Sequence, residues 1–215
     1  MEEIRIIEKP DWVTWDEIAE CIKVSQATNK KKGFDMSFGH YTGDQLRDSV
    51  NGGYTFVALN EENKVLATVS LKISRLHFWW CRGEAGFHCM ESVLPEYRGT
   101  DVYFDLHHQL ALKESQLGLK LLWASTHENN KTILRLSAKD GWKKMQYSAS
   151  GKNCFYYSII IAKWLQECPY SDRFINFMFW VSKVVVRFLY KPGKVLRFAF
   201  WKKKQKIAYL LLTKK

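Results

Sequence analysis

The stretch at residues 85–117 constrains the fold of this chain more than any other. Residues 85–93 form an apolar run that predicts a β-strand, and a Pro-Glu-Tyr-Arg-Gly turn at residues 95–99 follows it. A helical pattern then begins at Asp101. The first backbone N–H groups of a helix have no partner within the helix, and the helix dipole favours negative charge there. A strand, a basic glycine-containing turn and a helix in this order therefore predict a place for a phosphate group.

A second group of residues follows that helix. Asn130 precedes a predicted helix at residues 132–138, and Lys139-Asp140-Gly141-Trp142 comes directly after it. Together with the strand, turn and helix, these residues resemble the GNAT superfamily of acyl-CoA-dependent N-acyltransferases. The resemblance implies that the turn holds the pyrophosphate of coenzyme A, and that Asn130 and the Gly-aromatic pair flank the next helix.

The predicted order of elements is similar to that of the same family. It is a strand, two helices, three antiparallel strands, a helix, a strand, a helix and two strands, at residues 4–7, 15–27, 42–51, 54–59, 65–73, 85–93, 102–117, 119–125, 132–138, 142–149 and 154–162. We expect an α/β (α+β) fold with a GNAT-like mixed, mostly antiparallel central sheet and helices on both faces. The expected units are an acyltransferase domain at residues 1–165 and a basic, aromatic, amphipathic C-terminal extension at residues 166–215.

The cysteines predict neither a zinc site nor a disulfide framework. They are five in number, widely spaced and without a CxxC pair, at Cys21, Cys81, Cys89, Cys154 and Cys168. Reduced cysteines fit a cytosolic compartment, and the acidic start of the chain is not a secretory signal. We expect a cytoplasmic protein, and peripheral attachment to the inner face of the membrane is the alternative location. We expect no metal, because no spacing of histidines and carboxylates predicts a site.

The turn departs from the family pattern at two positions. That pattern, Arg/Gln-x-x-Gly-x-Gly/Ala, falls on residues 98–103, where Asp101 and Tyr103 replace the small residues. Side chains there would hold a phosphate away from the backbone. The Asp101 carboxylate either caps the helix or repels the pyrophosphate. The resemblance assigns the binding of acetyl-CoA or another acyl-CoA to Val93, Arg98, Gly99, Thr100, Asp101, Val102, Tyr103 and Asn130.

The expected chemistry needs a base, because a free amine must attack the thioester. Glu91 is the first candidate, since apolar neighbours on its strand would raise its pKa toward neutrality. The alternative is that Glu91 is a strand residue with an ion-pair partner. His88 and His127 are alternative bases, and for His127 a structural role is the competing interpretation.

The family's usual proton donor is absent. It is a Tyr seven residues after the Asn, and Ser137 occupies that position here. A serine hydroxyl is a weak acid on a short side chain, so the thiolate would leave without a dedicated acid, or Tyr147 or Tyr103 would replace it. The expected catalytic set is Glu91, Ser137 and His127, with backbone N–H groups near Val93 polarising the thioester carbonyl.

The positive charge of the chain is concentrated at its C-terminal end. Twelve of the 33 Lys and Arg residues lie at residues 173–215, which contain no Asp or Glu, whereas the rest of the chain is near neutral. Residues 174–190 are mostly apolar, but they are too short and too charged for a good membrane span. They predict a helix lying in the interface of an anionic membrane. Packing on the domain and a homodimer contact are alternatives, and nucleic acid is disfavoured because no readout motif is present.

Two functions remain open from the sequence. The first is an N-acyltransferase that moves an acetyl or longer acyl group from acyl-CoA to a primary amine. Its acceptor would be a small molecule such as an amino sugar, or a lipid-linked amine. The second is a catalytically degenerate GNAT-fold binding module attached to a membrane or a partner protein. Asp101, Tyr103 and Ser137 favour this second function, because each replaces a residue that the family uses.

Overall fold

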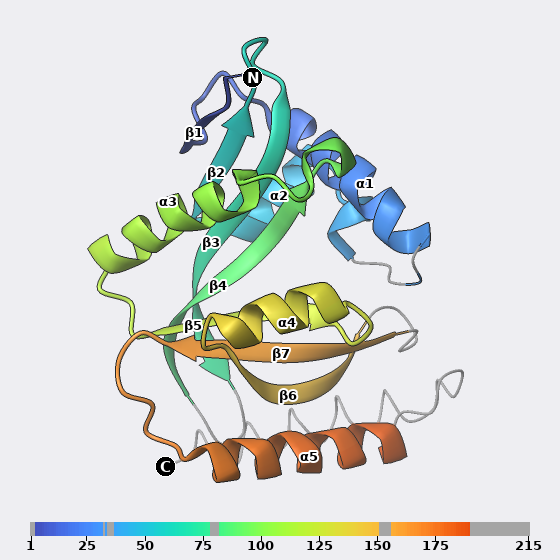
Figure 1. The fold of residues 1–215 in the computed structure, drawn as a ribbon, viewed down its shortest axis with the longest axis vertical. Coiled ribbons are helices and arrows are strands. Elements are labelled where there is room, and N and C mark those ends of the chain that lie inside the picture. The colour runs from blue at the N-terminus through green and yellow to red at the C-terminus, as the bar shows by residue number, and fades with distance from the viewer. Residues whose placement is uncertain (1–2, 32, 34–36, 78–81, 151–155, 190–215) are drawn as a thin grey trace.

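A seven-stranded sheet forms the centre of the structure (Figure 1). The computed structural model describes residues 3–31, 33, 37–77, 82–150 and 156–189. The strands are β1 (Arg5–Glu8), β2 (Tyr54–Leu59), β3 (Val65–His77), β4 (Arg82–Val93), β5 (Leu121–His127), β6 (Lys143–Ser150) and β7 (Tyr156–Trp164). The helices are α1 (Trp15–Lys31), α2 (Gly43–Val50), α3 (Val102–Gln116), α4 (Lys131–Lys139) and α5 (Asp172–Leu189), with short 3-10 helices η1 (Ser37–His40) and η2 (Pro95–Tyr97).

The sheet is mixed but mostly antiparallel. Its order is β1-β2-β3-β4-β5-β7-β6, and every neighbouring pair is antiparallel except β4 and β5. Helix α3 lies across one face of the first four strands, and α1 and α2 lie on the other side (Figure 1). The predicted fold class is confirmed.

Reciprocal caps begin the first two helices. The Thr14 hydroxyl accepts a hydrogen bond from the Glu17 N–H at 3.2 Å, and the Glu17 carboxylate accepts one from the Thr14 N–H at 2.7 Å. Thr42 and Gln45 repeat this arrangement ahead of α2. Each of these reciprocal pairs, known as a capping box, provides hydrogen-bond acceptors for N–H groups that a helix start leaves without partners. Thr14 is thus the cap of α1.

An extra residue interrupts β4 where it pairs with β3. Thr68 lies opposite Ser92, but Ser70 lies opposite Cys89, so three steps along β4 match two along β3. Met90 has a φ of 56°, in the left-handed region that few non-glycine residues adopt. These features define a β-bulge, which bends a strand and redirects its side chains.

The bulge determines which side chains of β4 point toward α3. In a regular strand, residues three apart face opposite sides of the sheet. Because of the extra residue, His88 and Glu91 both contact α3, His88 through Glu114 and Glu91 through His107. The two strand positions singled out as candidate bases therefore lie on one face.

Helix α5 packs along β6, the last strand of the sheet (Figure 1). The Ser182 hydroxyl accepts a hydrogen bond from the Tyr147 N–H at 2.8 Å and donates one to the Phe179 carbonyl at 2.7 Å. Ile175 and Met178 are buried. The first part of the predicted extension is thus packed on the sheet.

Several sequence predictions concern residues that the structure does not describe. Cys81, Cys154 and residues 190–215 lie outside the described ranges, whereas Cys21, Cys89 and Cys168 are free thiols. Among the helices in the described ranges, none has both the length and the apolar character needed to cross a bilayer.

Replacing Ile175 with Ala is expected to lower the free energy of unfolding by about 2–5 kcal/mol, because the deleted atoms leave a cavity among Ala85, Leu121, Met145 and Ala162. Urea unfolding measures this change. Phe177→Ala, on the exposed side of the same helix, is the matched control and should change the value by less than about 0.5 kcal/mol. Similar losses in the two variants would show that α5 does not pack on the sheet through Ile175.

Candidate functional site

The parallel strands β4 and β5 pair over a short length. Their register runs only from Gly86 opposite Leu122 to His88 opposite Ala124. Past that point the two strands separate, and η2 and α3 follow β4 while α4 follows β5 (Figure 1). Ligands of open α/β sheets commonly bind where neighbouring strands part at their carboxyl ends. This place is the candidate site.

Three side chains from β4 and α3 form a polar cluster at this place. The Glu91 cluster consists of Glu91, Tyr103 and His107. The Glu91 Oε1 and His107 Nε2 atoms are 3.0 Å apart, and the Tyr103 hydroxyl donates a hydrogen bond to the Glu91 carboxylate. The rings of Tyr103 and His107 have centroids 4.5 Å apart. The side chains of Glu91 and His107 are 27% and 26% exposed, so a ligand can reach the pair.

The ionisation of the Glu91 cluster differs from the sequence-based expectation. Burial by itself raises the pKa of Glu91, as expected, but the charge and hydrogen bonds of His107 and Tyr103 outweigh it and hold that pKa at about 2. Burial lowers the pKa of His107, but the adjacent Glu91 carboxylate outweighs it and raises that pKa above its ordinary value. The expected rise in the Glu91 pKa is therefore wrong, because the ion-pair alternative holds. Glu91 is a carboxylate at neutral pH, and His107 is the member of the pair whose pKa is raised above its ordinary value.

A second acid–imidazole pair lies beside the first. The His88 Nε2 atom is hydrogen bonded to the Glu114 carboxylate of α3, and both side chains are buried. The His88 ring also lies 5.1 Å from the Trp142 ring and 5.9 Å from the His107 ring, measured between centroids. Burial makes His88 a less accessible base than His107.

The side chain of Arg98 is directed into the protein. Its Nε atom donates to the Val93 carbonyl at 3.2 Å, and a terminal nitrogen donates to the Ser25 carbonyl at 2.9 Å and to the Ser25 hydroxyl at 3.0 Å. The guanidinium thus ties the turn to the end of β4 and to α1. Its contribution to an anion site is to position the turn.

The backbone of the turn meets the requirements for an anion. Gly99 has a φ of 87°, which a residue with a Cβ adopts only with strain. The first α-helical hydrogen bond of α3, between residues four apart, runs from the Asp105 N–H to the Asp101 carbonyl at 2.9 Å. The N–H groups of residues 102–104 precede that bond, so they are placed to meet a phosphate. This donor set fits the pyrophosphate of coenzyme A.

The two departures from the family pattern have different outcomes. Asp101 is exposed at the N-cap position, but its side chain makes no capping hydrogen bond, so the first of its two alternative roles, capping the helix, is wrong. Its carboxylate is therefore held by no contact with the helix start. The side chain of Tyr103 is half-buried and bonded to Glu91, so it is directed toward β4.

The remaining predicted residues lie on β5 and α4. His127 is buried, its Nδ1 atom accepts a hydrogen bond from the Asn129 N–H at 3.0 Å, and burial lowers its pKa. The Asn130 side chain caps α4 by accepting a hydrogen bond from the Ile133 N–H at 3.4 Å. Ser137 lies in the last turns of α4. The Glu91 cluster is built from β4 and α3, so these three residues are not part of it.

Of the two tyrosines proposed as substitute acids, one lies in the cluster. The Tyr147 hydroxyl donates to the Glu128 carboxylate and lies 3.5 Å from an Arg187 nitrogen. Burial, and then the hydrogen bond to Glu128, raise the pKa of Tyr147 to about 12. Tyr103 is thus the tyrosine beside the candidate base.

His107 and Glu114 were not predicted from the sequence. They follow Tyr103 by four and eleven residues, a spacing that places all three on one side of a helix. That signal acquires chemical meaning only once α3 is known to cover His88 and Glu91. In the part of the chain that the structure describes, no group of three or more His, Cys, Asp or Glu side chains could hold a metal ion.

Comparison with known proteins supports the fold alone. No family model and no curated protein matches the sequence. The chain is similar in structure to an acetyltransferase of the GNAT family from Staphylococcus aureus Mu50, with a TM-score of 0.58, 15% identity, and 76% of this chain and 100% of that chain covered. It is also similar to a chain of the NatC complex bound to Gag peptide and CoA, with a TM-score of 0.58, 16% identity and coverages of 76% and 99%. A third similar structure is the ribosomal-protein-S18-alanine N-acetyltransferase from Escherichia coli, with a TM-score of 0.57, 14% identity, and 79% of this chain and 98% of that chain covered. Over about three quarters of its length, the chain has the fold of the GNAT acetyltransferases.

Proposed function

We propose that this protein is an acyl-CoA-dependent N-acyltransferase with His107 as its base. The observation that carries the proposal is the Glu91–His107 pair, which lies where β4 and β5 separate, with Glu91 before and His107 after the turn that begins α3. A general base for amine acylation needs a pKa near the working pH and access to the acceptor. Burial lowers the pKa of His107, but Glu91 outweighs it and raises that pKa, and the side chain is partly exposed, so His107 is the member of the cluster best suited to act as a base.

The turn at residues 98–103 is the proposed site for the pyrophosphate of acyl-CoA. Gly99 shapes this turn, Arg98 fixes it to β4 and α1, and the N–H groups of residues 102–104 supply donors. When bound, acyl-CoA supplies an activated acyl group, whose bond to sulfur breaks as a bond to the acceptor nitrogen forms. Backbone N–H groups between the bulge at Met90 and Val93 are the proposed donors to the acyl oxygen, because a bulge interrupts strand pairing.

Each member of the Glu91 cluster has a distinct proposed role. The imidazole Nε2–H of His107 donates to Glu91, which leaves Nδ1 to take the proton from the acceptor amine. The Glu91 carboxylate orients the ring and stabilises the imidazolium that forms. Burial and the adjacent Glu91 carboxylate raise the pKa of Tyr103, so its proposed role is to orient Glu91 through their hydrogen bond, and the thiolate leaves without a dedicated acid.

The acceptor is proposed as a primary amine, on an amino sugar or on a lipid-linked molecule. The direct test is release of free CoA thiol from acetyl-CoA and longer acyl-CoAs with a panel of amino sugars, amino acids and aminoacyl lipids. A melting temperature that neither CoA nor acetyl-CoA raises would reject the proposal. Binding of CoA without thiol release for any amine would favour the non-catalytic GNAT-fold module, for which the replacement at Ser137 is the supporting observation.

Asp101→Asn is expected to tighten CoA binding about fivefold, because it removes a like charge beside the pyrophosphate. Isothermal titration with CoA measures the change, and added salt should reduce the difference between variant and parent. Asp11→Asn, which neutralises another exposed carboxylate outside the turn, should leave affinity unchanged. Weaker binding by Asp101→Asn would mean that this carboxylate contributes a contact of its own.

The pH dependence of activity tests the base. With His107 as base and its pKa raised, kcat/KM should rise with pH through a pKa above the ordinary histidine value of about 6.5. Glu91→Gln should move that pKa to lower pH, since the carboxylate that raises it is gone. NMR titration of the His107 ring measures the same shift without a substrate.

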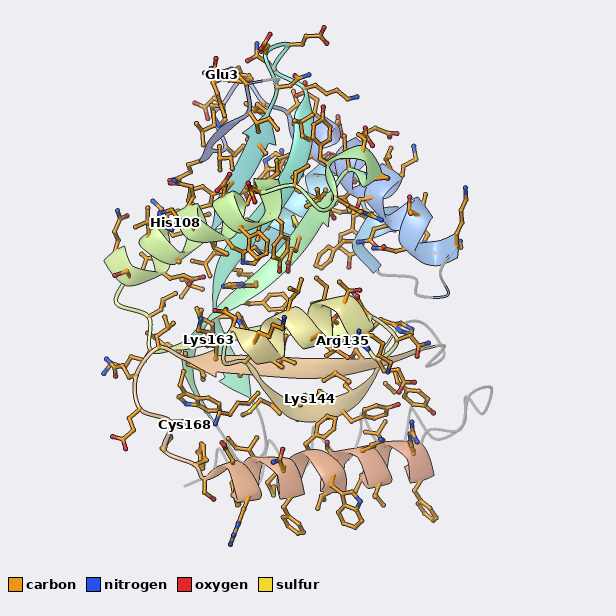
Figure 2. The ribbon with its side chains drawn as sticks, in the orientation of Figure 1. Glu3, His108, Arg135, Lys144, Lys163 and Cys168 are labelled. Atoms are coloured by element: carbon orange, nitrogen blue, oxygen red, sulfur yellow. The ribbon has the colours of Figure 1, made fainter. Side chains whose placement is uncertain are left out.

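Two further variants complete this test. His107→Gln should lower kcat/KM by at least about a hundredfold. His108→Gln, at the exposed neighbouring position on α3 (Figure 2), should have little effect. A His107 pKa that is the same in the parent and in Glu91→Gln would contradict the assignment.

A further inference from the structure

Helix α5 has one face on the sheet and an exposed apolar face opposite. Phe177, Trp180, Val184 and Phe188, here called the α5 stripe, recur at helical spacing and lie on one side of the helix. Their aromatic members are 58%, 59% and 72% exposed in chain order. Figure 2 shows ring side chains projecting from α5 on the side away from β6. A contiguous exposed patch of large apolar side chains on a folded domain marks an interaction surface.

The charged residues of α5 are mostly basic, and its acidic residue, Asp172, is paired with Lys143. Asp172 is the last acidic residue of the chain, and residues 173–215 carry twelve Lys or Arg. In α5 itself these are Arg173, Lys183 and Arg187, and Arg187, whose side chain is 54% exposed, is paired with the Glu128 carboxylate at 3.6 Å. Long basic side chains beside aromatic rings fit the boundary between lipid head groups and acyl chains.

We propose that the α5 stripe docks on an anionic lipid bilayer and lies in its interface. The aromatic rings enter the head-group region, and the basic side chains of α5 contact the acidic lipid heads. Charge complementarity selects this occupant. A second copy of the chain, docked through the same face, would bring the basic side chains of two α5 helices together, and like charges repel.

The position of α5 is compatible with an active site in the same molecule. Helix α5 lies at the end of the structure opposite β1, on the far side of β6 from α4 (Figure 1). The place where β4 and β5 separate is formed by other elements. Docking through the α5 stripe therefore leaves the Glu91 cluster uncovered, so this inference stands whether or not the protein is an acyltransferase.

The test is flotation of the full chain with two kinds of vesicle, of phosphatidylcholine alone and of phosphatidylcholine mixed with phosphatidylglycerol. We expect binding to the mixed vesicles and at least tenfold less to the neutral ones. Added salt should weaken binding to the mixed vesicles in part, because apolar burial resists screening. The triple variant Phe177→Ser, Trp180→Ser, Phe188→Ser should lose at least tenfold in affinity, since it removes three rings from the contact.

Matched controls distinguish an effect of the α5 stripe from an effect of exposed aromatic side chains in general. Trp12 and Phe104 are 54% and 59% exposed outside α5, and their replacement by Ser should leave vesicle binding unchanged. The triple variant should unfold at the same urea concentration as the parent, because it changes exposed positions only.

Four outcomes would overturn the proposal. The first is a full chain that ignores mixed vesicles. The second is a triple variant that binds mixed vesicles like the parent while a chain ending at residue 189 does not, which would place attachment in residues 190–215. The third is a parent dimer that the triple variant converts to monomer without vesicle binding. The fourth is tighter binding to a single-stranded oligonucleotide than to vesicles.

Discussion

The β-bulge at Met90 is the constraint on which the rest of the candidate site depends. One extra residue in β4 places His88 and Glu91 on the same face of the sheet, under α3. The left-handed backbone at Met90 costs of order 1–3 kcal/mol, and pairing with β3 on both sides of the bulge holds it in place. Without that residue, one of the two side chains would face α1 instead, and no pair of acid–imidazole contacts could form along α3.

The two acid–imidazole pairs differ in burial and therefore in what they can contribute. Removing charges from water costs free energy that their mutual attraction often only offsets, so a buried ion pair often stabilises a fold no more than apolar residues of similar size. The His88–Glu114 pair is buried, whereas the Glu91–His107 pair is reachable. In this arrangement the first pair fixes α3 against β4, and the second offers a protonatable ring to a ligand. Perturbed pKa values are typical of functional sites, although structural ion pairs also produce them.

Local patterns were sufficient to predict most of the fold, but not the site. The strand at residues 85–93, the turn around Gly99 and the helix that follows have strong short-range signals, and the structure places all three as predicted. The bulge has no such signal, because Met at position 90 gives no indication of a left-handed backbone. The direction of the Arg98 side chain, toward Ser25, depends on a residue far away in the sequence. The ionisation of Glu91 depends in the same way on His107, so neighbours along the strand gave the wrong direction for its pKa.

The packing of α5 along β6 has a consequence for self-assembly. A strand at the border of a sheet offers a row of unpaired N–H and C=O groups, onto which another chain can add a strand. In β6 the Tyr147 N–H donates a hydrogen bond to the Ser182 hydroxyl, and α5 lies against the strand. At the opposite border β1 has only four residues, and a short strand is a poor template. Helix α5 thus covers the β6 edge and prevents edge-to-edge aggregation. A fragment lacking α5 would be prone to polymerise through β6.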